Sequence, residues 1–500
     1  MAVLGGVTKR MRLCLIFPKS TFLEDPMVFP PLGLWWLWSV LERAGHEVSF
    51  IDMSEHNLKP KDIPRGFDAY LVSGTSPQGR EIRKLGLEFR RRGVPAVLGG
   101  PHATNYPRNS RKYYPLVVRR EGEQAVLKAI SHIERGMPLE FLSDEDLAGS
   151  RNGDREAAER YQQGIIEEPF VADLGSVPIP NRSYADHYRY YLADENGEKR
   201  RGTTMFTSRG CPKRCDFCDS PNLWSRVVRN TPMPKLVDEL RQIRELGFDA
   251  VQFYDDILPI NPRRVRELCG HLQAFGLIWR CFCRVDIISK HGGKEYLKFM
   301  HDHGLREVLI GAESGSQKIL DNIHKETTVE QNATVLEWCD EVGIRCKLSF
   351  IIGLPGETYE TLEETKSFLR RHLIRANRRI HHKVDLCSYI PMAGTPIYKA
   401  VMRQRGDGAD VDEEFDSYGY HPGENFSDFD LQWNVDAALM DNFFYEPEVM
   451  DEGVQPDEVF YKGRMGAVRA IVSTSSLGRE ELQRARDEME AEVRAAGISY

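Results

Sequence analysis

Three cysteines follow one another closely in the stretch TSRGCPKRCDFCDSP, which spans residues 207–221. Cys211, Cys215 and Cys218 have the spacing C-x3-C-x2-C, and a glycine and a proline beside Cys211 favour a loop over a helix. Metal sites that are closed entirely by protein usually have four protein ligands. Three thiolates can instead hold three irons of a four-iron cubane cluster, because thiolate is the usual cluster ligand. The spacing therefore predicts an iron–sulfur centre with one iron open to a ligand.

A structural zinc site is the alternative, with a fourth ligand that is distant in sequence. That ligand is a histidine or one of three cysteines: Cys269, Cys281 and Cys283. The chain has 10 cysteines in 500 residues, which is too sparse for a disulfide scaffold and favours metal binding or catalysis for a cysteine cluster. Six other cysteines fall mostly in strand or helix patterns and are expected in the hydrophobic core. They are Cys269, Cys281, Cys283, Cys339, Cys346 and Cys387.

The elements that must position the cysteine loop follow from the apolar pattern after residue 203. Six short β-rich runs are separated by helical patterns, which predicts a partial (β/α)6 barrel of the TIM type. The runs span residues 203–208, 250–256, 279–286, 307–314, 346–354 and 383–390. In such barrels the chemistry lies at the carboxyl ends of the strands. The cysteines come directly after the first run.

The first part of the chain shows a second alternation of strand and helix patterns. It predicts an α/β, doubly wound, Rossmann-like domain with a parallel sheet, which binds ligands at the carboxyl ends of its strands. The β-rich runs span residues 12–17, 47–53, 69–74, 96–100 and 116–119. We expect four parts: this domain over 1–140, a linker over 141–202, the barrel over 203–400 and a C-terminal domain over 401–500.

The C-terminal domain is expected to be a small α-rich extension. Its segment 407–461 holds 17 Asp and Glu residues and no Lys or Arg, while the rest of the chain has 67 basic and 58 acidic residues. Disordered acidic tails are poor in aromatic side chains, but this segment is rich in them. We therefore expect it to fold and to serve as a cover over the substrate. The pattern at 479–497 is typical of a solvent-exposed helix.

The cysteine motif, with Phe217 directly before the third cysteine, resembles the signature of the radical S-adenosylmethionine (SAM) enzymes. The resemblance covers about residues 200–400, because FYDD, GAESGS, FIIGLPGET and YIPMAGTPIY follow in order at predicted strand ends. It implies that Cys211, Cys215 and Cys218 hold a 4Fe–4S cluster. SAM would chelate the open iron, and one electron would cleave it to a 5′-deoxyadenosyl radical.

Residues at these strand ends are the SAM contacts that the resemblance implies. Asp255 and Asp256 would meet the methionine amino group, and Glu313 would accept hydrogen bonds from the ribose. The two aspartates can instead be helix N-caps. Arg284 would pair with the SAM carboxylate or a second cofactor, or form a salt bridge at the rim of the core. The full set of SAM candidates is Phe217, Asp255, Asp256, Arg284, Glu313, Ser314, Gly353 and Pro355.

The N-terminal domain resembles the cobalamin-binding domain that precedes the radical SAM barrel in one subgroup. The stretches SGTSP, LGGPHAT and EGEQAV occur in its order. The resemblance implies that small residues at two strand ends accept the nucleotide tail of cobalamin: Ser73, Gly74, Thr75, Gly99, Gly100 and His102. The D-x-H-x-x-G motif that supplies an axial histidine in many cobalamin proteins is absent. The lower face of the cobalt would therefore be open, or would meet water or another residue such as His102. A flavodoxin-like domain whose glycines only make turns is the alternative to a cobalamin-binding domain.

Together these resemblances imply an enzyme with three cofactors: a 4Fe–4S cluster, SAM and cobalamin. The expected reaction is methylation of an unactivated carbon or phosphorus of a small molecule, through a 5′-deoxyadenosyl radical and methylcobalamin. A cyclase, ring-rearranging or oxidising enzyme with the same cofactors is the alternative, and a non-catalytic cluster or cobalamin sensor is a more distant one. Only Cys14 precedes residue 211, so the additional N-terminal cluster of methylthiotransferases is excluded.

The composition and the N-terminal sequence indicate which partners and which cellular location to expect. Mean hydropathy is −0.45, and no apolar run approaches the roughly 20 residues of a membrane span. The N-terminus lacks the layout of a signal peptide. A basic footprint for nucleic acid is not evident. We expect a cytoplasmic protein that meets a small-molecule substrate and an electron donor such as a flavodoxin or a ferredoxin.

Overall fold

The computed structural model describes most of the chain up to residue 405. The described residues are 9–405 without 21, 22, 24, 374–379, 381, 390 and 391, together with 433, 434, 480, 482–484, 487, 488 and 491. The chain divides into two compact units. Unit 1 comprises residues 1–189 with 222–224 and 229–235, and unit 2 comprises the remainder.

Unit 1 contains a parallel sheet with the strand order β2-β1-β3-β4-β5-β6. Its strands are β1 (Arg12–Phe17), β2 (Glu47–Asp52), β3 (Ala69–Ser73), β4 (Ala96–Gly99), β5 (Leu116–Arg119) and β6 (Ile165–Glu167). The chain moves outward from β1 to β2 and then returns to place β3 on the other side of β1. This reversal is the topological switch point of a doubly wound fold, at which such sheets bind their ligands.

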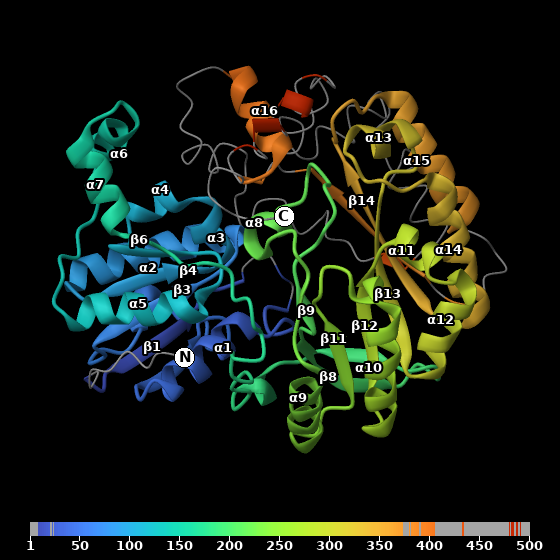
Figure 1. The fold of residues 1–500 in the computed structure, drawn as a ribbon, viewed down its shortest axis with the longest axis horizontal. Coiled ribbons are helices and arrows are strands. Elements are labelled where there is room, and N and C mark those ends of the chain that lie inside the picture. The colour runs from blue at the N-terminus through green and yellow to red at the C-terminus, as the bar shows by residue number, and fades with distance from the viewer. Residues whose placement is uncertain are drawn as a thin grey trace, which may run out of the picture. The chain divides into compact units, whose positions relative to one another are not determined.

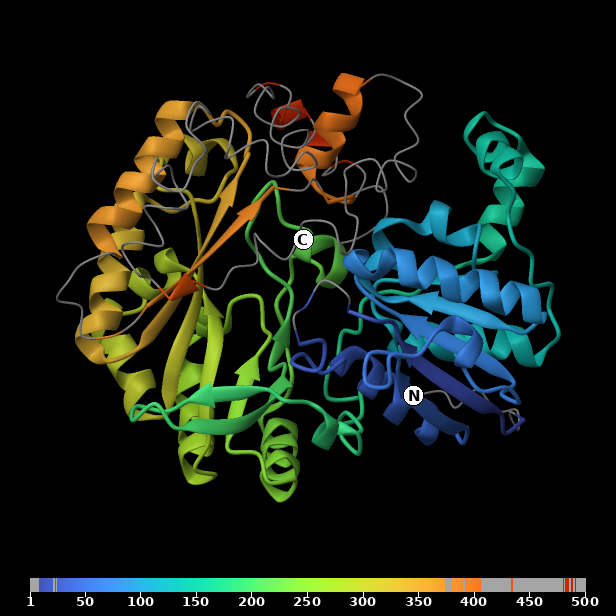
Figure 2. The same ribbon diagram turned by 180° about the vertical axis from the view of Figure 1, so that it is seen from behind.

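The inner strands β1, β3, β4 and β5 are buried on both faces, and their sequences read as short apolar runs, as is usual in parallel sheets. Successive side chains of a strand point to opposite faces. Cys14 and Ile16 of β1 therefore pack in one core with α2 (Gly79–Arg92), whereas Leu13 and Leu15 face the other side, and all four are 0% exposed. Helices α1 (Leu32–Arg43) and α5 (Gly122–Glu134) contact the strands and each other. Figures 1 and 2 show helices on both faces of the sheet, as predicted.

Residues 141–202 contain more regular structure than the sequence indicated. Helices α6 (Asp144–Arg151) and α7 (Arg155–Gln163) begin at the N-caps Ser143 and Asp154, whose side chains accept backbone N–H bonds. The short strand β6 then extends the sheet by pairing with β5. A three-residue strand that follows two polar helices has too little periodic signal to be recognised in a sequence.

Unit 2 is built on a curled sheet with the order β16-β15-β14-β13-β12-β11-β8-β7. Six strands run parallel: β8 (Lys199–Met205), β11 (Ala250–Phe253), β12 (Ile278–Cys283), β13 (Leu305–Glu313), β14 (Arg345–Ile352) and β15 (Lys383–Ser388). The edge strands β7 (Tyr191–Ala193) and β16 (Trp433–Asn434) pair antiparallel. Figure 1 shows helices α12 (Gly293–Asp302), α14 (Val329–Val342) and α15 (Tyr359–His372) on the outer side of the curled sheet. The predicted partial barrel is confirmed.

Strand β12 shows how the two faces of this sheet differ. Arg280 points to the inner face, where its guanidinium bonds to Glu307 at 2.7 Å and to Gln252 at 2.8 Å. Cys281 and Cys283 point to the outer face and are 0% and 4% exposed. The prediction of core cysteines is confirmed for the five whose burial the structure describes: Cys269, Cys281, Cys283, Cys339 and Cys346.

The end of the chain is described only in part. Helix α16 (Pro396–Arg405) packs with α13 (Gln317–Asn322) in one apolar cluster. Leu482 is 1% exposed in the same cluster, so the pattern at 479–497 is not solvent-exposed on all sides. Apart from β16, the acidic segment 407–461 lies outside the described residues. Within the described part of the chain, the structure contains no helix that is long and apolar enough to cross a membrane.

Candidate active site

The three cysteines lie on an irregular loop between the short strand β9 (Ser208–Arg209) and helix α8 (Ser220–Trp224). Gly210 opens the loop with φ +102°, and a Cβ atom there would collide with the carbonyl oxygen of Val227. The backbone N–H of Cys211 donates to the carbonyl of Ser225 at 3.3 Å. The backbone N–H of Cys218 donates to the carbonyl of Cys215 at 3.2 Å, so the last two cysteines share a turn. A loop of this kind can present its thiols to one centre.

Asp255 and Asp256 follow β11 and hold both ends of the loop. Asp255 is fully buried and accepts bonds from Thr207 N at 2.7 Å, Thr207 Oγ1 at 2.6 Å and Ser208 Oγ at 2.5 Å. Burial raises the pKa of Asp255 to about 6. Asp256 accepts from Ser220 Oγ at 2.5 Å, and burial also raises its pKa. Neither aspartate caps a helix in the structure, and their contact with a SAM amino group stays a prediction.

Arg284 contacts the second cysteine directly. It follows β12, and its Nη1 donates to the Sγ of Cys215 at 3.3 Å, while its Nε pairs with Asp286 at 3.0 Å. Its Nη2 donates to the backbone carbonyl of Lys325. The expected salt bridge at the rim is present, whereas a bond from Arg284 to the SAM carboxylate stays a prediction. A cationic donor at a ligating sulfur suits an anionic cluster.

The segment 323–326 contacts the residues between the cysteines. Lys213 Nζ pairs with Glu326 at 3.0 Å. Asp216 is fully buried, and its backbone N–H donates to the carbonyl of Ile323 at 3.0 Å. The carboxylate of Asp216 also bonds to Nδ1 of His324 at 3.2 Å. Sequence reasoning missed this segment, and its charged run HKE after an apolar helix end was the only available signal.

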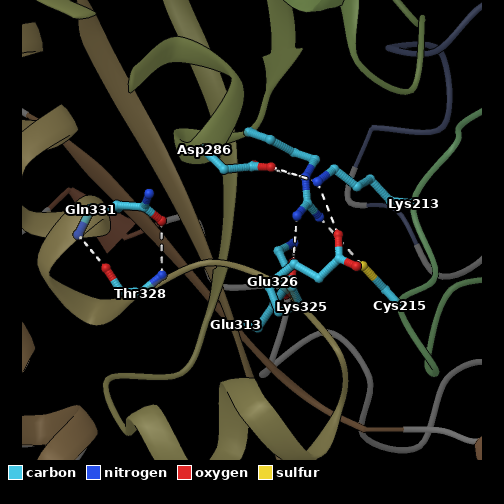
Figure 3. Close-up of polar contacts among 9 residues, drawn as sticks. Lys213, Cys215, Asp286, Glu313, Lys325, Glu326, Thr328 and Gln331 are labelled. Atoms are coloured by element: carbon cyan, nitrogen blue, oxygen red, sulfur yellow. Dashed lines mark hydrogen bonds and ion pairs between the residues drawn. The ribbon is translucent and has the colours of Figure 1, made fainter. Parts of the chain in front are cut away.

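Glu313 and Ser314 lie where β13 ends. Glu313 is 5% exposed and has φ +60°, and its Oε1 accepts from Lys325 Nζ at 2.5 Å. Ser314 is 1% exposed and shares a hydrogen bond with Thr365 Oγ1 at 3.1 Å. Figure 3 shows Glu313 and Lys325 grouped with Glu326 in the lower part of the view, with Cys215 to their right and with Lys213 and Asp286 above them. The structure therefore brings the predicted ribose contact together with the cysteine loop.

The loop after β14 carries Gly353 and Pro355, both of which are buried. The backbone N–H of Gly353 donates to the carboxylate of Glu357. Burial raises the pKa of Glu357 to about 7. Leu354 of this loop belongs to the apolar cluster against which Phe217 packs, and the Nζ of Lys325 lies 5.5 Å from the centre of the Phe217 ring. Phe217 thus places the third cysteine beside the loop that was predicted to contact adenine.

The three thiols fit an iron–sulfur cluster better than they fit a zinc ion. Burial raises the pKa of Cys211 to about 11, so its thiolate would need a bound metal at neutral pH, whether that metal is zinc or the iron of a cluster. The cysteines considered as a fourth zinc ligand, Cys269, Cys281 and Cys283, gather around Tyr296. Cys281 and Cys283 lie on the face of the sheet opposite to Arg284 and Cys215. Among the described residues, no group of three or more His, Cys, Asp or Glu is arranged to hold a single metal ion.

In unit 1 the predicted cobalamin contacts come together at the carboxyl ends of β3 and β4. Gly100 has φ +87°, and a Cβ atom there would lie 2.5 Å from Ser73 Oγ and 3.0 Å from the carbonyl oxygen of Gly74. The backbone N–H of His102 donates to the same carbonyl at 3.1 Å. Glycine is therefore required at 100, because the two loops touch. Gly99 lies at the end of β4, and Thr75 is exposed beside the site.

A polar ligand fits this edge of the sheet. Ser76 is 2% exposed, and its Oγ has no hydrogen-bond partner among the described residues. Hydroxyls and backbone amides of this kind suit the ribose and phosphate of a nucleotide tail. The ring of His102 is buried, and its centroid lies 5.3 Å from that of Tyr106. The individual cobalamin contacts, and any cobalt ligand from the protein, stay predictions.

Two family models match this chain, in the order that the sequence predicted. Residues 21–130 match the B12 binding domain, and residues 205–369 match the radical SAM superfamily. The chain therefore carries a B12 binding domain in front of a radical SAM domain. It is an enzyme, and its cofactors are a 4Fe–4S cluster, SAM and cobalamin.

Curated relatives have different reactions. The chain is 28% identical to an uncharacterized methyltransferase of Pyrococcus horikoshii, over 73% of this chain and 78% of that protein. It is 29% identical to the anaerobic magnesium-protoporphyrin IX monomethyl ester cyclase of Rubrivivax gelatinosus, over 72% of this chain and 66% of the cyclase. It is 25% identical to the cytidylyl-2-hydroxyethylphosphonate methyltransferase of Streptomyces wedmorensis, over 71% of this chain and 76% of that protein.

Solved structures share the fold. The radical SAM methyltransferase TsrM from Kitasatospora setae, with cobalamin and a 4Fe–4S cluster bound, has a TM-score of 0.61 at 15% identity, over 98% of this chain and 100% of that chain. The cobalamin-dependent S-adenosylmethionine radical enzyme OxsB, with aqua-cobalamin bound, has a TM-score of 0.59 at 15% identity, over 99% of this chain and 82% of that chain. At this identity the likeness establishes the arrangement of the fold.

Proposed function

We propose that this enzyme is a cobalamin-dependent methyltransferase that methylates an unactivated carbon, or a phosphorus, of a small molecule. The observation that carries the proposal is the combination of a B12 binding domain with a three-cysteine loop in one chain. Relatives named as methyltransferases support it, among them one that is named for a phosphonate substrate.

The roles of the chain's own residues follow from the contacts of the cysteine loop. When bound, the cluster and SAM supply a one-electron route to a radical, and cobalamin supplies a methyl carrier. Cys211, Cys215 and Cys218 would hold three irons and leave one for SAM. Arg284 would balance charge at a ligating sulfur, and Glu313 would orient the ribose.

Ring formation or oxidation without methyl transfer is the second candidate function. The relative named as a cyclase, at 29% identity, favours it. Both reactions use the same cofactors, so the cysteine loop and the B12 domain do not separate them. A small-molecule substrate, a flavodoxin or ferredoxin as electron donor and a cytoplasmic location belong to the same proposal.

The stoichiometry of SAM products tests the proposal. The full chain is reconstituted anaerobically with iron, sulfide and hydroxocobalamin, then incubated with SAM, dithionite and a panel of candidate acceptors. A methyltransferase that uses the radical route forms one S-adenosylhomocysteine and one 5′-deoxyadenosine for each product, and the product gains the mass of one CH2. Formation of 5′-deoxyadenosine alone, with a product that lacks this gain, supports the cyclase or oxidase and rejects the methyltransferase.

A further inference from the structure

A buried ion pair joins the end of β13 to the segment after α13. Lys325 Nζ lies 2.5 Å from Glu313 Oε1, and the two side chains are 7% and 6% exposed. Figure 3 shows Lys325 and Glu313 in the same group of residues as Glu326 and Cys215. A buried pair of this kind costs desolvation, and apolar residues of similar size often give equal or greater stability. Its presence therefore favours a role in positioning over a role in stability.

The backbone around Glu313 is shaped to house this pair. A Cβ atom at Gly311 would collide with Glu313 Oε1 and would lie 2.9 Å from Lys325 Nζ, so glycine leaves the space that the pair occupies. The pairing of β13 with β14 shifts register between Gly311 and Glu313. Glu313 itself has φ +60°, which is a strained conformation for a residue with a side chain. Strain at this position aims the carboxylate away from the regular path of the strand.

The same lysine reaches the cysteine loop through its backbone. Its carbonyl accepts the Nη2 of Arg284, whose Nη1 donates to Cys215 Sγ at 3.3 Å. The side chain and the backbone of Lys325 thus connect a carboxylate at a strand end with a cysteine of the loop. A shift of residue 325 would move both partners together.

We propose that Lys325 is a positioning residue that aligns the Glu313 carboxylate for the SAM ribose hydroxyls and couples this alignment to Cys215. Lys325 occupies Oε1 of Glu313, which leaves Oε2 for the ligand. The inference rests on the radical SAM assignment and on the proposed ribose contact, and it does not depend on methyl transfer.

Binding of SAM to the reconstituted, unreduced enzyme tests the proposal without turnover. The variants are Lys325→Met, Lys325→Arg and the control Lys318→Met, which removes an exposed lysine on α13. We expect the Kd for SAM to rise roughly 10- to 100-fold in Lys325→Met, as for other residues that orient a ligating group. Lys325→Arg should restore most of the affinity, and Lys318→Met should match the wild type.

The electron paramagnetic resonance spectrum of the reduced cluster is the second readout. SAM should change this spectrum in the wild type and in Lys318→Met, and the change should be smaller or absent in Lys325→Met at the same SAM concentration. Iron and sulfide content should stay equal in all variants. Wild-type affinity and a wild-type spectral change in Lys325→Met would overturn the proposal, whatever product the enzyme forms.

Gly311→Ala is the independent variant, because it keeps both charges and removes only the space for the ion pair. It should weaken SAM binding in the same direction as Lys325→Met. If Lys325→Met does not fold, Gly311→Ala still tests whether the ion pair positions Glu313 for SAM. Wild-type affinity for SAM in Gly311→Ala, in protein with full iron content, would refute the positioning role.

Discussion

Glu357 offers a quantitative prediction about pH, because its carboxyl group is buried in the loop after β14. It is 9% exposed, and one of its oxygens, Oε1, has no hydrogen-bond partner among the described residues. The other oxygen accepts the backbone N–H of Gly353. Burial is the largest cause of its altered titration and raises its pKa from 4.5 to about 7. The folded chain therefore binds this proton more tightly than the unfolded chain does.

The sign and size of the effect follow by linkage. Between pH 4.5 and about 7 the folded state holds the proton and the unfolded state has lost it, so the free energy of unfolding falls as the pH rises. At about 1.4 kcal/mol per pH unit, the loss amounts to about 3 kcal/mol and is complete above pH 7. Glu357→Gln does not titrate and can still accept the Gly353 N–H. Relative to the wild type, it should gain about 3 kcal/mol between pH 4 and pH 8.

Hydrogen exchange in a denaturant series measures this locally, because a chain of two units need not unfold in one step. Peptides that cover β14 and α15 (Tyr359–His372) report the opening of this region in the cofactor-free protein. Glu364→Gln, which changes an exposed carboxylate on α15, is the control and should show the wild-type pH dependence. A Glu357→Gln variant that also keeps the wild-type pH dependence would refute the assignment of the titration to Glu357.

Three further predictions concern cofactor binding. Cys215→Ala should abolish the 4Fe–4S cluster while the circular dichroism spectrum stays unchanged, as measured by iron content and visible absorbance. Asp256→Ala should remove the hydrogen bond from Ser220 and lower cluster occupancy severalfold after reconstitution. Full cluster occupancy in this variant would show that the cysteine loop does not need this hydrogen bond. Gly100→Ala should lower cobalamin retention on gel filtration at least tenfold, because its Cβ would lie 2.5 Å from Ser73 Oγ. Gly45→Ala, with φ +93° and nothing within 4 Å, carries a similar backbone cost and should retain cobalamin.

The two sheets could be predicted because their strands are apolar runs of limited length with helical patterns between them. The boundaries were less predictable where polar residues form strand structure. Strand β8 begins at Lys199, four residues before the predicted run, because its polar start pairs with β7. The stretch KRRG at residues 199–202 forms a strand only because it pairs with β7, since its residues have no alternating apolar pattern.

The positions of residues next to a strand end were predictable. Asp255, Arg284 and Glu313 lie at or just after strand ends, as predicted, because parallel strands end at one edge of a barrel. Their roles in binding SAM stay predictions. The contacts of the segment 323–326 were not predictable, because they depend on pairs far apart in sequence. Lys213 and Glu326 are separated by 113 residues, and no local pattern specifies that they meet.

Backbone strain shows why this segment matters to the site. Six non-glycine residues among those the structure describes have positive φ, and four of them surround the cysteine loop: Ser225, Glu313, His324 and Glu326. Ser225 has φ 72° and ψ 170°, a region that is occupied almost only by glycine, and its carbonyl accepts the N–H of Cys211. Each such residue costs about 1–3 kcal/mol and persists only when its surroundings over-determine it. Because the strained residues contact the loop, its spacer residues or Lys325, the fold maintains this strain to keep the cysteines and the Glu313 carboxylate in one fixed arrangement.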